Sequence, residues 1–102
     1  MDAAGNGEDP RLSPRICNMI REDLPRQLAN CQDLHQRGDG AALAREIHQI
    51  KGTAAFCGFR GLRSACEDAE QRVREERGHP ETLAGLREIE RQVQTVLDSL
   101  PA

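Results

Sequence analysis

Apolar residues recur along the chain three and four positions apart, which is the spacing of helices that bury one face. Ser13-Pro14 is a favourable helix start, because Ser can cap the first turn and Pro suits the first helical position. The residues that follow predict a short first helix, with its apolar side formed by Ile16, Met19 and Ile20.

Pro25 disfavours helical geometry at Leu24, so we expect a break or kink there. A second helix is predicted over about residues 25–37. Its apolar side would carry Leu24, Leu28, Cys31, Leu34 and His35.

The third predicted helix covers about residues 40–57. The segment Arg37-Gly38-Asp39-Gly40 would end the helix before it, and Asp39 can cap the new one. At 100° per residue its apolar positions fall within a stripe about 80° wide. These positions are Leu43, Ile47, Ile50, Ala54 and Cys57.

Two further helices are predicted after Gly58 and Gly61. The fourth helix should end near Arg77-Gly78, and its apolar side would be Phe59, Leu62, Cys66, Ala69 and Val73. His79-Pro80 opens the last helix, which ends before Pro101. Its stripe would be Leu86, Ile89, Val93, Val96, Leu97 and Leu100.

One apolar face per helix and short connections predict an all-α, antiparallel up-down-up-down four-helix bundle over residues 13–102, with the short first helix across one end. Aromatic residues are 2% of the sequence, so the core must be aliphatic, and Val, Ile and Thr are too sparse for strands. Residues 1–12 are rich in Gly, Asp and Pro, and we expect a disordered lead-in or linker there.

The composition also bears on function and compartment. The net charge of −3 and the scarcity of aromatics do not suggest a nucleic-acid binder. No apolar run approaches the roughly 20 residues of a membrane span, and the N-terminus lacks the features of a signal peptide. We therefore expect a cytoplasmic protein without direct membrane contact, and a monomer because no apolar stripe is left over.

The four cysteines have no CxxC spacing and do not cluster with histidines, so they are interpreted as buried, reduced thiols. A metal-binding bundle that uses His and Cys is the alternative reading. The residues are Cys17, Cys31, Cys57 and Cys66.

Of the three histidines, His48 is the candidate for chemistry. His35 is read as a packing residue and His79 as a solvated one, whereas His48 should project into solvent about 130° from the centre of its helix stripe. Small residues lie one or two turns away, at Ala44, Gly52 and Ala55. Gly within a helix costs about 1 kcal/mol relative to Ala, so clearance for a docking partner would explain it.

Lys51, one turn from His48, places a cation where a phosphoryl group on the imidazole would lie. The run from His48 to Gly58, continued by Leu62, Cys66 and Glu70, resembles the signature of histidine phosphotransfer (HPt) domains. The signature begins with an H-x-x-K-G core, which is followed by a pair of small residues and a Gly. A Leu, a Cys or Ala, and a Leu-Glu pair then follow at set spacings. Ala69 departs from it, because a larger aliphatic is usual before Glu70.

The stretch from Phe56 to Glu70 also resembles the C-terminal HPt domains of hybrid sensor kinases. The resemblance implies a phosphoryl carrier in two-component signalling. His48 would carry the phosphoryl group, Lys51 would stabilise its charge, Gly52 would give access, and Glu70 would bond the other ring nitrogen. An interhelical salt bridge with an arginine is the competing role for Glu70.

The expected partners are receiver domains of response regulators or of a hybrid kinase, docked on the surface around His48. The docking residues would be Ala44, Arg45, Ala55 and Phe56. Phe56 is read first as a cap on the bundle and second as part of an apolar contact patch. Arg45, Arg60, Arg63 and Arg74 could add positive potential near the site, although most of them suit an ordinary solvated face.

No Gly-rich nucleotide loop is present, so we expect no autokinase activity from ATP. No cofactor is expected on this chain, and Mg²⁺ would come with the receiver. The rival function is a non-catalytic helical adaptor in which His48 is incidental.

Overall fold

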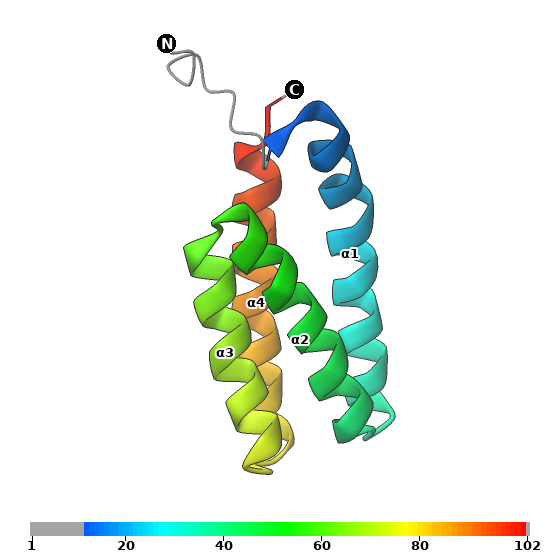
Figure 1. Cartoon of the computed structure of the whole chain (residues 1–102). Helices are drawn as coiled ribbons and strands as arrows, with labels where there is room; N and C mark the ends of the chain where they lie inside the picture. Colours follow the sequence, from blue (N-terminus) through cyan, green and yellow to red (C-terminus); the bar gives the residue numbers. More distant parts are fainter. Residues whose placement is uncertain (1–11, 102) are drawn as a thin grey trace.

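Four helices make up the described chain. The structure is a computed structural model that describes residues 12–101, and over this range it contains no strand. The helices are α1 (Pro14–Gln36), α2 (Gly40–Cys57), α3 (Arg60–Arg74) and α4 (His79–Ser99). α2 and α4 each lie between α1 and α3, so the four form a closed antiparallel bundle (Figure 1). The predicted all-α bundle is confirmed.

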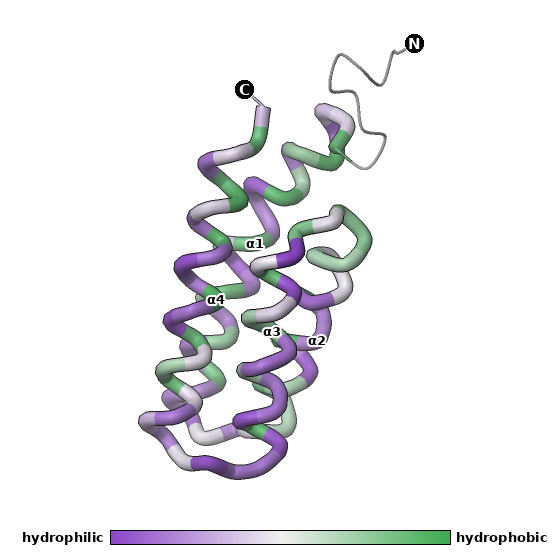
Figure 2. The backbone as a smooth tube through the Cα atoms, turned by 90° about the vertical axis from the view of Figure 1, so that its left-hand side faces the viewer, coloured by the Kyte–Doolittle hydropathy of each residue, from purple (hydrophilic) through white to green (hydrophobic). Residues whose placement is uncertain are grey.

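The core is aliphatic, as the composition predicts. Figure 2 shows hydrophilic and hydrophobic stretches alternating along each helix, with hydrophobic residues gathered where α2 passes into α3. The largest fully buried side chains come from all four helices: Leu24, Cys31, Leu43, Ile47, Ile50, Leu62, Cys66 and Ile89. Apart from Met19, which is 49% exposed, the predicted stripes are therefore the faces that meet at the centre of the bundle.

The predicted break at Pro25 is wrong, because α1 continues through it and the short first helix is simply its first turns. A proline inside a helix removes one hydrogen bond and costs about 3 kcal/mol. Here Pro25 lies on the exposed side, where water can bond the released carbonyl. Leu24 and Leu28 are buried on either side of it, so burial of the common face holds the helix together.

Caps fix where α1 and α2 begin. The Ser13 hydroxyl accepts a hydrogen bond from the Ile16 N–H at 3.3 Å, and Asp39 Oδ1 accepts one from the Ala42 N–H at 3.1 Å. Gly58 ends α2 in the left-handed conformation with φ 78°, which suits glycine. This tight turn sends α3 back along α2, so that the middle of α3 faces the middle of α2.

α3 ends three residues before the predicted Arg77-Gly78 boundary, at Arg74. Glu76 adopts a left-handed conformation with φ 50°, which stops the helix although the residue is not glycine. Nearby ion pairs join Arg77 to Glu75 and Glu81. A boundary made by a non-glycine residue in this conformation carries no recognisable turn signal.

A close approach between α3 and α4 explains the departure at Ala69. A Cβ built on Gly85 of α4 would lie 3.1 Å from the Ala69 Cβ and 3.2 Å from its Cα. Two small residues therefore face each other, and a larger aliphatic at position 69 would have no room. Ala69 is fully buried and lies directly before Glu70, so this contact also helps to position Glu70.

The ends of the described chain and its cysteines complete the fold. The predicted lead-in covers residues 1–12, of which 1–11 lie outside the described residues. Leu12 does not belong to such a lead-in, because it packs against the core. All four cysteines are buried thiols, as predicted. Among the described residues, no helix combines the length and the apolarity that a bilayer crossing requires.

Candidate functional site

His48 stands on the solvent side of α2, as predicted. Its neighbours Ile47 and Ile50 are fully buried in the core, which turns His48 outward. Its side chain is 62% exposed, so a reacting group can reach the ring from solvent. The rigid middle of a helix, and not a loop, therefore presents the imidazole.

Glu70 of α3 lies beneath this ring. It is only 4% exposed, and burial of a carboxylate is costly unless charge and hydrogen bonds compensate. Its Oε2 lies 3.2 Å from Nδ1 of His48. An ionised carboxylate can only accept, so the geometry makes Nδ1 the donor and leaves the lone pair on Nε2.

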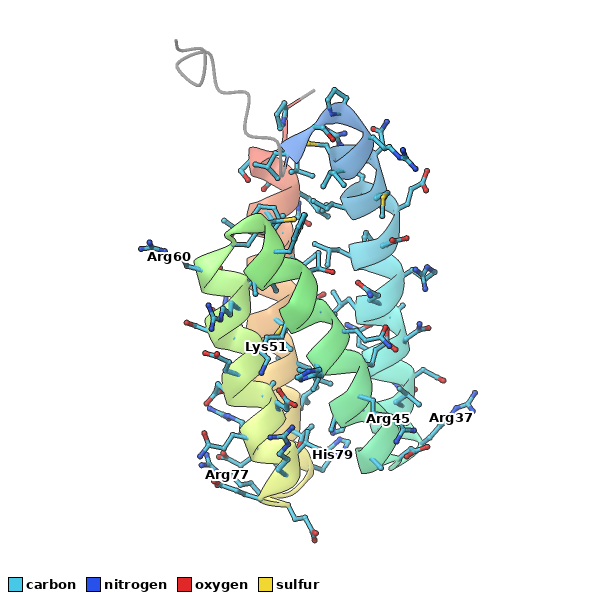
Figure 3. The ribbon with its side chains drawn as sticks, viewed as in Figure 1. Arg37, Arg45, Lys51, Arg60, Arg77 and His79 are labelled. Atoms are coloured by element: carbon cyan, nitrogen blue, oxygen red, sulfur yellow. The ribbon has the colours of Figure 1, made fainter. Side chains whose placement is uncertain are left out.

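Two cations share the same carboxylate. Lys51 Nζ of α2 lies 3.4 Å from Glu70 Oε1, and Arg74 Nη2 of α3 lies 2.6 Å from Oε2. Figure 3 shows Lys51 at the seam between α2 and α3. The role that the resemblance implies for Glu70 is present, since it contacts the imidazole, whereas the competing interhelical salt bridge with an arginine is absent among the described residues. Arg74 lies one turn along the same helix, whereas the pairs with His48 and Lys51 are the ones between helices.

Gly52 leaves open space beside the imidazole. A Cβ built on it would meet nothing within 4 Å. Gly52 is also exposed, and it borders a groove of about 300 Å³ between α1 and α2. The clearance expected from the sequence is therefore present.

Phe56 does not cap the bundle, contrary to the first of its two readings. It is 61% exposed and lines the groove with Met19, another large apolar side chain that is 49% exposed. Phe59 packs against the core instead. The positive φ of Gly58 turns the chain inward between the two phenylalanines, and helix periodicity alone does not reveal that turn.

A second hollow, of about 350 Å³, lies on the other side of His48 between α2 and α3. Its lining includes two arginines and consists of Ala44, Arg45, His48, Gln49, Glu70 and Arg74. Ala55, the last expected docking residue, is exposed on α2. Arg60 points away from Lys51 (Figure 3), and Arg63 pairs with Glu67 at 3.4 Å. Of the four arginines considered, Arg45 and Arg74 therefore flank the imidazole.

The other two histidines meet at one end of the bundle. The rings of His35 and His79 stack with centroids 4.0 Å apart and an angle of 15° between their planes. The packing role expected of His35 is confirmed, but His79 is more than a solvated residue. Burial of His35, reinforced by the adjacent His79, lowers the pKa of His35. Only the antiparallel arrangement of α1 and α4 brings these residues together, so neither local sequence signals it.

Metal and thiol chemistry find little support in the described part of the chain. Residues 12–101 contain no group of three or more His, Cys, Asp or Glu side chains that could hold a metal ion. Burial raises the pKa of Cys31 and Cys66 to about 12, so these thiols stay protonated at neutral pH.

Comparison with protein families identified a match over most of the chain. A protein-family model described as "Hpt domain" matches residues 15–100. The searches of curated proteins and of solved structures found no match.

Proposed function

The chain belongs to the Hpt domain family, and from this membership we propose that His48 carries a phosphoryl group between receiver domains in a two-component phosphorelay. The single observation that supports this role most strongly is the Nδ1–Oε2 contact of 3.2 Å beneath an imidazole that is 62% exposed. The contact holds the ring in one tautomer, and the exposure of the ring leaves Nε2 open to a reacting group.

The reaction follows from that tautomer. The Nε2 lone pair attacks the phosphorus of a receiver aspartyl phosphate, a P–N bond forms, and the P–O bond to the aspartate breaks. The aspartate leaves as a carboxylate, and the imidazole gains positive charge while Nδ1 keeps its proton. Glu70 stabilises that charge through the same hydrogen bond. Transfer to a second receiver is the reverse reaction.

Lys51 supplies positive charge next to the transferred group. Phosphoryl transfer passes through a loose transition state, so positioning and charge stabilisation dominate the catalysis. Lys51 is held by Glu70 at 3.4 Å, yet its side chain remains 27% exposed. It can therefore stay anchored near the ring while its ammonium reaches a phosphoryl oxygen.

The receiver would dock over α2, with Gly52 and Ala44 giving it clearance on either side of His48. The groove between α1 and α2 exposes Phe56 and Met19 to an apolar partner surface. The hollow on the α3 side presents arginines to the acidic active site of a receiver. Mg²⁺ would be held by the receiver, and we expect no phosphorylation of this chain by ATP alone. A cytoplasmic location and a monomeric state belong to the same proposal.

The test is to incubate the protein with receiver domains phosphorylated by a small-molecule donor in the presence of Mg²⁺. We expect an acid-labile label on the wild type, none on His48→Gln, and undiminished label on the matched control His79→Gln. No label on the wild type with any of a broad receiver panel, or full label on His48→Gln, would refute the relay. Receiver binding without label would favour the adaptor function.

A further inference from the structure

Arg74 is placed to do more than pair with its neighbour. It lies one turn after Glu70 on α3, and its Nη2 approaches Glu70 Oε2 to 2.6 Å. That oxygen is the one that also contacts Nδ1 of His48. Arg74 also lines the hollow beside the imidazole, and its side chain is 68% exposed.

Most ion pairs four residues apart on a helix are exposed and weak. Arg63 and Glu67 form such a pair on α3, with side chains 57% and 49% exposed. The partner of Arg74 is different, because Glu70 is buried and already contacts Lys51. A second cation on one buried carboxylate exceeds what neutralisation of that carboxylate requires.

The charges explain the excess. Lys51 and Arg74 together carry two positive charges against one negative charge on Glu70, which leaves this cluster of three side chains with one surplus positive charge. A phosphoryl group brings about −1.5 to −2 at neutral pH. The site is thus prepared for an anion that Lys51 alone would not balance.

We propose that Arg74 is a second phosphoryl-binding cation, which bridges Glu70 and the phosphoryl group carried on His48. A guanidinium has five N–H donors in a rigid fork, so one nitrogen can hold the carboxylate while another binds a phosphoryl oxygen. Its exposure gives it freedom to reach toward Nε2. The proposal rests on the proposed function and adds to it a residue that remains anchored before and after transfer.

Arg74→Ala tests the proposal, with Arg91→Ala as the matched control. Arg91 also pairs with a glutamate on its own helix, at 2.5 Å from Glu88, but it lies on α4, which does not pack against α2. We expect Arg74→Ala to slow transfer from a phosphorylated receiver about tenfold, the size of one lost charge-assisted hydrogen bond. Arg74→Lys should recover part of the rate, and Arg91→Ala should match the wild type.

Two measurements separate a phosphoryl contact from mere support of Glu70. In a Glu70→Gln background, Arg74→Ala should still slow transfer, because the contact it removes is to the phosphoryl group. In the phosphorylated protein, a ³¹P NMR titration should show a higher pKa for the second ionisation of the phosphoryl group in Arg74→Ala than in the wild type, since a nearby cation favours the dianion.

A wild-type rate in Arg74→Ala, an effect that disappears in the Glu70→Gln background, or an unchanged ³¹P titration would overturn the role of Arg74. Those results leave the label on His48 intact, so they refute this inference alone. An unlabelled wild type would instead refute the proposed function and this inference together. Circular dichroism of each variant checks that α3 still folds.

Discussion

The Oε2 atom of Glu70 lies 3.2 Å from Nδ1 of His48, so a residue that is 4% exposed orients one whose side chain is 62% exposed. The two come from different helices, and the contact depends on how α2 and α3 pack. The imidazole is open to solvent, whereas burial holds the carboxylate in a fixed position. The first prediction tests this contact.

Glu70→Gln should keep the shape of the side chain while it removes the charge. We expect transfer to slow by about tenfold, because the imidazole cation formed during transfer loses a charged hydrogen-bond acceptor. ¹⁵N NMR of the imidazole should also show a lower fraction of the Nδ1-protonated tautomer. Glu67→Gln, an exposed change on the same helix, is the control. An unaltered tautomer ratio would contradict the orienting role.

Substitution of Gly52 should separate stability from access. Gly52→Ala should stabilise the protein by about 1 kcal/mol, because alanine favours the helix and its Cβ meets nothing within 4 Å. Gly52→Gln should also favour the helix but should weaken receiver binding and slow transfer by crowding the imidazole. Thermal unfolding and receiver affinity measure the two effects. If the Gln variant binds and transfers like the wild type, clearance does not explain this glycine.

Ala69→Leu should destabilise the bundle, since Gly85 of α4 leaves no space for a larger side chain. Overpacking of this kind typically costs about 1–3 kcal/mol, which urea unfolding can measure. Ala84→Leu, on the exposed side of α4, is the matched control and should change stability little. Equal stabilities of the two variants would show that α3 and α4 can move apart without penalty.

The stacked histidines should make stability depend on pH. Burial, then His79, lowers the pKa of His35 below its ordinary value of 6.5, so the unfolded chain binds the proton more tightly. Stability should therefore fall as the pH drops through 6.5 toward the lower folded pKa, and should be fully present above 6.5. Asp39 and Glu76 are the acidic residues that line the adjacent hollow.

The matched variant is His35→Phe, which keeps an aromatic ring but cannot titrate. Urea midpoints measured between pH 5.5 and 8 should decline more steeply with acid for the wild type than for this variant. Parallel slopes would show that His35 protonates equally well in the folded and unfolded states.

Periodicity and capping predicted most of the fold. The stripe of α2, its Asp39 cap and the outward position of His48 all follow from local rules, and the structure confirms them. The continuity of α1 through Pro25 does not follow, because burial on either side overrides a local penalty. The left-handed conformation of Glu76, which ends α3, does not follow from local rules either.

The site was predictable only as far as single helices determine it. His48, Lys51 and Gly52 share one helix, so spacing alone related them. Arg74 could be placed four residues from Glu70, but its sharing of the oxygen that contacts His48 depends on the register between α2 and α3. The exposure of Phe56 likewise depends on the turn at Gly58, and not on helix periodicity.

The two ends of the described chain lie at the same pole of the bundle (Figure 1), where the Arg21 guanidinium bonds the Pro101 carbonyl. His48 lies about midway along α2, away from that pole. Both described ends therefore lie away from the flank that the imidazole faces.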